Sequence, residues 1–215
     1  MNRRQFAGHC SVLLAAASAW RALPAAADGP SRTVLVLGDS LSAEYGLARG
    51  TGWVALLAQR LEALKMNVQV VNASISGDTT SGGRSRLPEL LARYHPTQVI
   101  LELGGNDALR GLPLSMTASN LGEMVHAAKT AGARVLLVGM QVPPNYGRKY
   151  ADDFAALFAR VAAAEGAALV PFLLQGVADA PQSESLFQAD RIHPNAKAQA
   201  TMLDNVWVGL KPLLR

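Results

Sequence analysis

The stretch TVLVLGDS, residues 33–40, decides the fold. Its first part, Thr33–Leu37, is a nearly continuous run of Val and Leu, and it leads directly into Gly38, Asp39 and Ser40. Such a run is typical of a parallel strand covered on both faces, whereas a half-exposed strand would alternate apolar and polar residues. We therefore expect a buried parallel strand that ends in a small, polar turn.

Apolar runs of the same kind recur along the chain. They predict strands at Val68–Asn72, Gln98–Leu103 and Arg134–Gly139, and a weaker one at Ala168–Val170. The segments between these runs carry apolar residues at helical spacing. The expected buried stripes are Trp53, Leu56, Leu57, Leu61 and Leu64, then Leu121, Met124, Val125 and Ala128, then Phe154, Leu157, Phe158 and Val161.

A last helix is expected from Asn195, a good N-cap residue, to about Gly209. Strands that alternate with helices predict right-handed βαβ units. The expected fold class is therefore α/β, a three-layer α/β/α sandwich around one parallel sheet of about five strands.

Length and composition favour one globular domain. The chain has 215 residues, 50% of them apolar and 17% charged, so it is long enough to form a core and too apolar to be disordered. No run of about 18 uncharged apolar residues follows the first 30 positions, so we expect no stable membrane anchor. The formal charge of +4 includes three arginines in residues 1–27, and the other charges nearly balance. Nucleic acid is therefore not an expected partner.

Residues 1–27 have the three zones of a cleavable secretory signal peptide, and an ordinary amphipathic first helix is the alternative. Two arginines lie within Met1–Phe6, an apolar stretch follows, and three alanines end the segment. We expect a periplasmic or secreted protein with a single mature domain at 28–215, and the arginine pair resembles a twin-arginine signal. Because Cys10 is the one cysteine, the mature domain would have no disulfide and no thiol nucleophile.

Small and polar residues gather where the predicted strands end. They form four segments, at 38–42, 73–79, 104–107 and, just before the last helix, 190–194. Parallel strands end at one edge of a sheet, and open α/β sheets bind ligands there. Any one segment alone would be an ordinary turn, because turns favour Gly, Asn, Asp and Ser. Together the four predict one polar site built from distant parts of the chain.

The predicted site contains the components of a catalytic triad. Ser40 supplies a hydroxyl, and His193 is the one histidine expected at this edge, because His126 falls in a helix and His95 precedes a strand. Asp190 stands three residues before His193, a spacing that places a carboxylate beside the imidazole. We therefore expect Ser40 as nucleophile, His193 as base and Asp190 as the residue that orients it. The surrounding residues do not form the Gly-x-Ser-x-Gly elbow, so the ordinary α/β-hydrolase fold is a poor match.

Four blocks in this order resemble the SGNH hydrolases, also called GDSL esterases, and especially their bacterial group of thioesterases, lysophospholipases and arylesterases. The blocks are Gly38–Ser42, Ser76–Thr80, Gly104–Asp107 and Asp190–Pro194. The resemblance implies an oxyanion hole made of the backbone N–H groups of Ser40 and Gly77 and the side-chain amide of Asn106. It also implies a flavodoxin-like sheet of order 2-1-3-4-5, with no cofactor and no metal.

The resemblance further implies that Leu109, Leu112 and Pro113 form an apolar wall over the acyl group of the substrate. A hydrophobic loop packed on the core is the other interpretation of these three residues. The expected function is that of a secreted serine esterase that acts through an acyl-enzyme intermediate. Its small-molecule substrates would be carboxylic esters or thioesters, among them aryl esters, acyl thioesters and lysophospholipids.

Two other functions fit parts of the sequence. A metal-dependent phosphoesterase could use Asp39, Asn106 and Asp107, but such sites need several His and Asp ligands, and only one histidine is expected at this edge. A carbohydrate-binding α/β module would need an aromatic groove, whereas aromatic residues make up 6% of the chain. Both are less well supported than the esterase.

Overall fold

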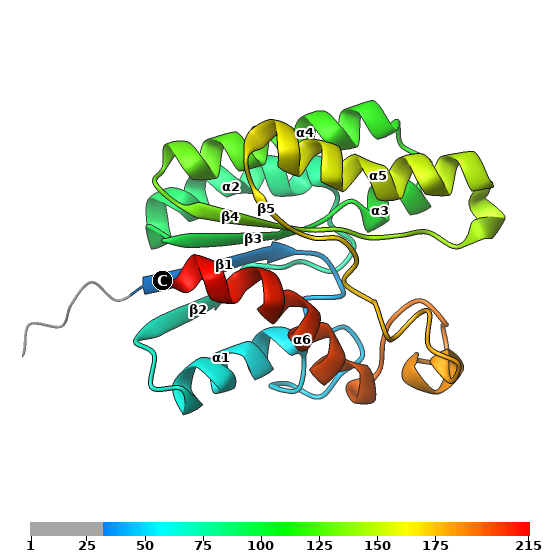
Figure 1. Cartoon of the computed structure of the whole chain (residues 1–215), viewed down its shortest axis with the longest axis horizontal. Coiled ribbons are helices and arrows are strands. Elements are labelled where there is room, and N and C mark those ends of the chain that lie inside the picture. The colour runs from blue at the N-terminus through cyan, green and yellow to red at the C-terminus, as the bar shows by residue number, and fades with distance from the viewer. Residues whose placement is uncertain (1–31) are drawn as a thin grey trace, which may run out of the picture.

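The computed structural model describes residues 32–215, so the predicted signal peptide at 1–27 lies outside the described residues. Five parallel strands form one sheet in the order β2-β1-β3-β4-β5 (Figure 1). They are β1 (Arg32–Gly38), β2 (Val68–Asn72), β3 (Gln98–Glu102), β4 (Arg134–Val138) and β5 (Ala168–Val170). The predicted strands and their order are confirmed, with ends that differ by one residue at most.

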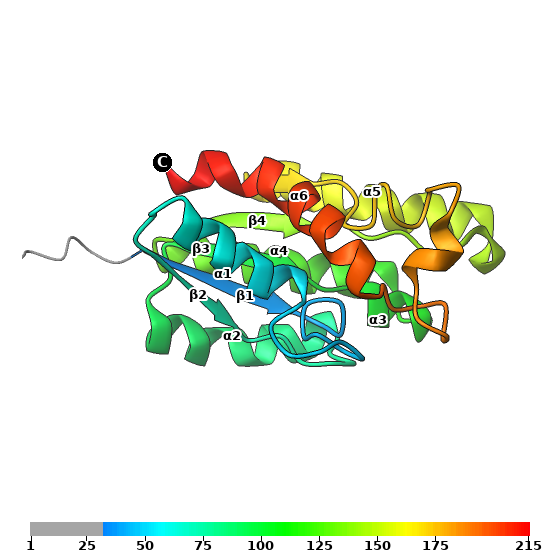
Figure 2. The same ribbon diagram turned by 90° about the horizontal axis from the view of Figure 1, so that it is seen from below.

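Helices cover both faces of the sheet, as predicted for a three-layer sandwich. On one face lie α1 (Trp53–Ala63) and α6 (Gln199–Leu210); on the other lie α2 (Thr80–Tyr94), α4 (Leu114–Thr130) and α5 (Arg148–Glu165) (Figures 1 and 2). A short helix, α3 (Gly105–Leu109), follows β3 directly. Residues 32–215 also contain four short 3-10 helices: η1 (Pro144–Tyr146), η2 (Ser183–Leu186), η3 (Ala196–Ala198) and η4 (Lys211–Leu214).

Burial of the apolar strands and of the apolar faces of the helices stabilises the sandwich. Strands β1, β3 and β4 are covered on both faces, and Val34–Leu37 have no exposed surface at all. The helical stripes pack against them as expected, with one exception. Leu64 is 54% exposed, because α1 ends at Ala63 and Leu64 forms its C-cap. The prediction that Leu64 belongs to the buried stripe was wrong.

Helix α2 has no counterpart among the predicted apolar stripes. Gly82, Gly83 and Pro88 lie within it and weaken any helical pattern in the sequence. The packing explains one of these residues, because a Cβ on Gly83 would lie 2.3 Å from Leu103 Cδ1. The side-chain hydroxyl of Thr79 caps the helix by accepting the N–H of Gly82 at 3.3 Å.

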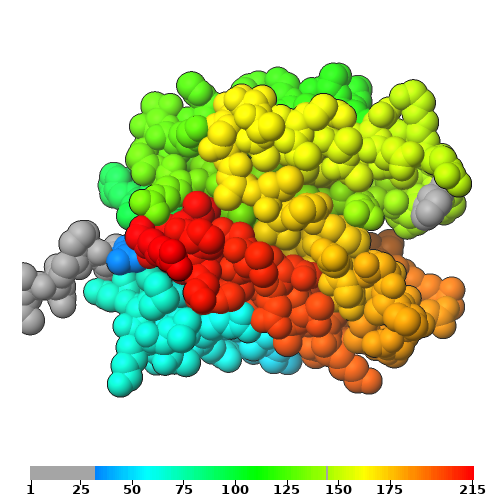
Figure 3. All heavy atoms as spheres, in the orientation of Figure 1, coloured from blue at the N-terminus to red at the C-terminus, as the bar shows by residue number. Residues whose placement is uncertain are grey.

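The last helix begins later than predicted. Asn195 does act as a cap, but its side chain accepts the N–H of Lys197 and starts the 3-10 turn η3, and α6 begins at Gln199. Residues 171–198, drawn mostly in orange, carry no long helix and reach the end of the molecule where the loops after the strands lie (Figures 1 and 3). Within residues 32–215, no helix is long and apolar enough to cross a bilayer.

The chain runs from β1 to β2 on one side and then to β3 on the other, so β1 has both as neighbours. The strand order therefore reverses beside the carboxyl end of β1, which is the usual ligand site of an open parallel sheet. Ser40 follows β1 at this position.

Candidate active site

Ser40 lies in a tight turn that a glycine permits. Backbone N–H groups of Ser42 and Ala43 donate to the Asp39 carbonyl and close the turn at 3.2 and 3.0 Å. A Cβ on Gly38 would lie 2.7 Å from Ser42 Oγ and 2.8 Å from Glu102 Oε2, so no other residue fits without a shift of these groups. Ser42 is 1% exposed, and its hydroxyl donates a hydrogen bond to Glu102 Oε2. Of the two serines, Ser40 therefore has the accessible hydroxyl.

The three residues of the predicted triad are in contact. His193 Nε2 lies 2.9 Å from Ser40 Oγ, and His193 Nδ1 lies 2.7 Å from Asp190 Oδ2. An ionised carboxylate only accepts hydrogen bonds, so Nδ1 carries the proton and Nε2 accepts from the serine hydroxyl. The fold has thus joined residues separated by 153 positions into one chain of hydrogen bonds.

The loop that carries Asp190 and His193 is held by its own hydrogen bonds. Asp190 Oδ1 accepts the N–H groups of Ile192 and His193, each at 3.0 Å. The backbone bond from His193, then the bond from its ring and the bond from Ile192 lower the pKa of Asp190 from 3.8 to about 2. Asp190 is therefore ionised at every pH at which the protein is expected to work. The ring of Tyr45 packs beside the imidazole, with centroids 4.3 Å apart.

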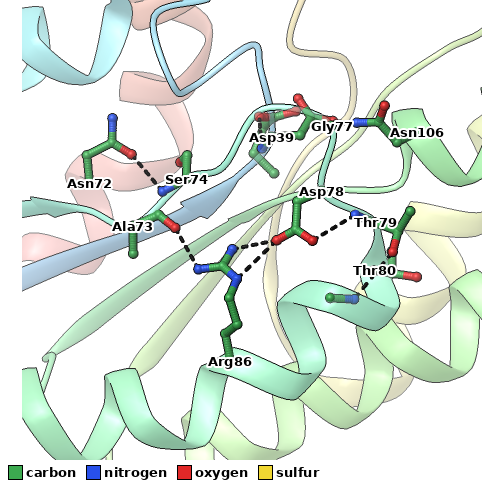
Figure 4. A network of polar contacts seen from close by, with 12 residues as sticks. Asp39, Asn72, Ala73, Ser74, Gly77, Asp78, Thr79, Thr80, Arg86 and Asn106 are labelled. Atoms are coloured by element: carbon green, nitrogen blue, oxygen red, sulfur yellow. Dashed lines mark hydrogen bonds and ion pairs between the residues drawn. The ribbon is translucent and has the colours of Figure 1, made fainter.

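The three predicted oxyanion donors reach the same edge from three strands. Ser40 follows β1. Gly77 lies in the loop between β2 and α2, and Asn106 lies in the first turn of α3 after β3 (Figure 4). Gly77 has φ +80°, a conformation that L residues rarely adopt, and the turn is closed by the Asp78 N–H to the Ile75 carbonyl at 3.1 Å. Within residues 32–215, the N–H groups of Ser40 and Gly77 donate to no protein acceptor, so both can bind a substrate oxygen.

Two carboxylates hold the loops around these donors. Asp78 Oδ2 accepts from Arg86 Nη2 at 2.5 Å and from Nε at 3.2 Å, and Arg86 Nη1 donates to the Ala73 carbonyl at 2.9 Å (Figure 4). Asp107 accepts the N–H of Thr80 at 2.9 Å and also its hydroxyl. The Gly77 loop is thereby tied to α2 on one side and to α3 on the other.

The residues predicted as an acyl wall lie where α3 meets α4. Leu109 is 44% exposed, Leu112 is half-buried, and Pro113 is exposed as the N-cap of α4. The sequence reasoning did not pick out four further exposed apolar residues on loops of the same edge: Tyr45, Ile75, Tyr146 and Ile192. The signal that could have found them is a single large apolar residue within an otherwise polar loop.

The other two histidines of residues 32–215 lie away from this site. His95 caps the C-terminus of α2 at the opposite edge of the sheet, and His126 is exposed on α4. In the described part of the chain, no three His, Cys, Asp or Glu side chains are grouped so that they could hold a metal ion. The ligand set that a two-metal phosphoesterase requires is thus not present among these residues.

This strand order and the contacts at this edge are those of a hydrolase built on a flavodoxin-like α/β/α sandwich. The chain belongs to the GDSL-like lipase/acylhydrolase family, whose model matches residues 36–201. It is 51% identical to esterase TesA of Pseudomonas aeruginosa over 184 residues, which are 86% of this chain and 90% of that protein. It is 41% identical to thioesterase 1/protease 1/lysophospholipase L1 of Escherichia coli K12 over 182 residues, 85% of each chain.

The similarity extends to the three-dimensional structure. The crystal structure of TesA superposes with a TM-score of 0.81 at 51% identity, covering 85% of this chain and 99% of the other. The family resemblance expected from the four sequence blocks is therefore confirmed.

Proposed function

We propose that the protein is a secreted serine esterase that cleaves carboxylic esters and thioesters through an acyl-enzyme intermediate. The observation that carries the proposal is the unbroken chain from Ser40 Oγ to His193 Nε2, at 2.9 Å, and from His193 Nδ1 to Asp190 Oδ2, at 2.7 Å. The enzyme class follows from the family, and the residue roles and the intermediate are the proposal.

In the first step Ser40 Oγ attacks the carbonyl carbon of the substrate, and His193 Nε2 takes the hydroxyl proton. Asp190, ionised because its pKa is about 2, stabilises the imidazolium that forms. The negatively charged oxygen of the tetrahedral intermediate accepts hydrogen bonds from the N–H groups of Ser40 and Gly77 and from Asn106 Nδ2. The imidazolium then protonates the leaving alcohol or thiol, which departs as the acyl-enzyme forms. In the second step a water molecule, deprotonated by His193, attacks the acyl-enzyme. The carboxylic acid is released and Ser40 regains its proton from His193.

The acyl part of the substrate is expected to be apolar. Leu109, Leu112 and Pro113 would line it, and the exposure of Leu109 favours ligand contact over packing on the core. The Tyr45 ring packs beside His193 and Ile192 precedes it in the chain, so both would lie near the leaving group that His193 protonates. The relative named thioesterase 1/protease 1/lysophospholipase L1 supports acyl thioesters and lysophospholipids as substrates, and aryl esters suit the same open site.

Hydrolysis of a p-nitrophenyl ester tests the nucleophile. We expect Ser40→Ala to lower kcat by on the order of 10⁴-fold or more, whereas His126→Gln, an exposed histidine on α4, should keep the wild-type rate. A chelator should have no effect on the rate. Activity retained in Ser40→Ala and lost with the chelator would instead support the metal-dependent phosphoesterase.

A substrate panel tests the acyl preference. Esters of increasing acyl length, one acyl thioester and one lysolipid should show the highest kcat/KM for an apolar acyl chain, and Leu109→Ser should reduce that preference. A rate independent of chain length in both proteins would remove Leu109 from the site.

The export proposal rests on residues 1–27 alone. We infer cleavage after Ala27 and a mature domain at 28–215 in the periplasm or medium, by the general or the twin-arginine route. N-terminal sequencing of the protein from the periplasmic fraction should begin at Asp28. An intact Met1 on active cytoplasmic protein would contradict this.

A further inference from the structure

Two carboxyl groups are buried directly behind the proposed nucleophile, and neither takes part in the proton transfers above. Asp39 is 3% exposed and Glu102 is fully buried. Glu102 Oε2 accepts from Ser42 Oγ at 2.7 Å and from the Asp39 N–H at 3.4 Å, while Oε1 has no partner among the described residues. Buried carboxyl groups with few partners are costly to ionise, so such a pair calls for an explanation.

Both oxygens of Asp39 hold parts of the proposed site. Oδ1 accepts the N–H of Leu41 at 3.0 Å, which fixes the turn around Ser40. Oδ2 accepts from Asn106 Nδ2 at 2.9 Å. Because an ionised carboxylate only accepts hydrogen bonds, it determines which end of the Asn106 amide faces it. A carboxamide rotated by half a turn would bring its oxygen against the carboxylate oxygen, and the two would repel.

We propose that Asp39 is a positioning residue for ester hydrolysis: its carboxylate orients the side-chain amide of Asn106, so that the second N–H of Nδ2 is presented to the substrate oxygen. This inference rests on the proposed function, because it acts through the oxyanion hole. Asp39 would not touch the substrate. It would keep a donor, rather than the amide oxygen, at the position where negative charge develops.

Of the two buried carboxyl groups, Asp39 is the one that carries the negative charge. Burial, and then the negative charge of Asp39, raise the pKa of Glu102 well above its ordinary range, so that Glu102 is neutral. Burial also raises the pKa of Asp39 from 3.8 to about 6. The hydrogen bonds from Leu41 and Asn106 and the charge of His193 oppose this increase, and the charge of Asp78 adds to it. Asp39 is thus ionised at neutral pH and takes up a proton in mild acid.

Protonation would reverse the role of Asp39. A carboxylic acid can donate to the amide oxygen of Asn106, and the amide would then turn and withdraw its N–H from the site. Activity would therefore fall in mild acid as Asp39 takes up a proton. The acid limb of a plot of log kcat/KM against pH should be steeper in the wild type than in a variant that has no carboxyl group at position 39.

A double-mutant cycle on kcat for a p-nitrophenyl ester tests the inference. Asp39→Asn should lower kcat by roughly 10- to 100-fold with KM changed by less than about 2-fold, and Asn106→Ala by roughly 100-fold or more. Because Asp39 acts through Asn106, the double variant should be within about 3-fold of Asn106→Ala alone. Losses that multiply, or a wild-type kcat in Asp39→Asn, would overturn the inference.

Glu102→Gln is the matched control, because it replaces a neutral acid of the same buried pair with a neutral amide. It should keep kcat within about 3-fold and keep the steep acid limb, whereas Asp39→Asn should have a shallower acid limb. An acid limb as steep as that of the wild type in Asp39→Asn, or a shallower one in Glu102→Gln, would overturn the inference. The proposed function is judged separately by whether the wild type cleaves the ester and Asn106→Ala slows it.

Discussion

At the scale of single residues, the proposed site depends on backbone conformations that few side chains allow. Gly77 has φ +80°, and a Cβ there would meet nothing nearer than Arg110 Nη2, at 3.8 Å. A larger residue would therefore fit in space, and its cost would come from the backbone alone. We propose that the same conformation directs the N–H of Gly77 toward the substrate oxygen, which would link backbone strain and function at this residue.

Gly77→Ala should lower the free energy of unfolding by about 1–2 kcal/mol and kcat by about tenfold or more as its N–H turns away. Urea denaturation and ester kinetics measure the two effects. Gly132→Ala is the matched control, with φ +88° and nothing within 4 Å, between α4 and β4 at the opposite edge. It should show the stability loss alone. An equal loss of kcat in both variants would contradict the role given to Gly77.

At the scale of elements, α2 and the loop before it support the site through one ion pair. Asp78 and Arg86 have side chains that are 12% and 27% exposed, so their contact is largely protected from water. A second ion pair joins Arg84 of the same helix to Glu123 of α4, and its side chains are about half exposed. Removing one partner of a largely buried ion pair destabilises a protein, because the other charge is left without a partner. Exposed ion pairs contribute little to the free energy of unfolding.

Arg86→Met should lower the free energy of unfolding by about 1–3 kcal/mol, because it leaves the Asp78 carboxylate and the Ala73 carbonyl short of donors. Arg84→Met should change it by less than about 1 kcal/mol. Chemical denaturation of both variants provides the comparison. Equal changes in the free energy of unfolding for the two variants would show that the Asp78–Arg86 ion pair does not hold the Gly77 loop in place.

The elements also show what a sequence can predict. Strands β1, β3 and β4 are buried on both faces, so their apolar runs are plain in the sequence. Helix α2 was missed because Gly83 serves packing against Leu103, a contact that exists only after folding. The triad was predictable because one histidine remained at the functional edge. Glu102 was not, because within the run Gln98–Leu103 nothing indicates that its side chain meets Ser42 and Asp39.

At the scale of the whole molecule, burial of Asp39 links stability to pH. A carboxyl whose pKa is raised on folding stabilises the protein below its unfolded pKa and loses that contribution as pH rises through the folded pKa. For Asp39 this window runs from 3.8 to about 6. Asp190 has the opposite sign, because its lowered pKa contributes stability that is lost only as pH falls toward 2.

Asp39→Asn should therefore be more stable than the wild type at pH 8 by about 1–3 kcal/mol, with the difference fading by pH 4. Urea denaturation at several pH values measures it. Asp153→Asn is a control at a half-exposed surface carboxyl whose pKa is lowered by the hydrogen bond from Lys149, and it should gain no stability at pH 8. An Asp39→Asn variant that is less stable at every pH would show that the buried charge does not oppose folding.

The fold places Ser40, in the turn after the first strand, in contact with His193, in the loop before the last helix. Covalent labelling with a fluorophosphonate, followed by peptide mass spectrometry, tests this juxtaposition most directly. The account predicts one label per molecule, on Ser40 and not on the buried Ser42, with labelling slowed greatly in His193→Gln and absent in Ser40→Ala. Label on another residue, or ester cleavage at the wild-type rate by unlabelled Ser40→Ala, would contradict it.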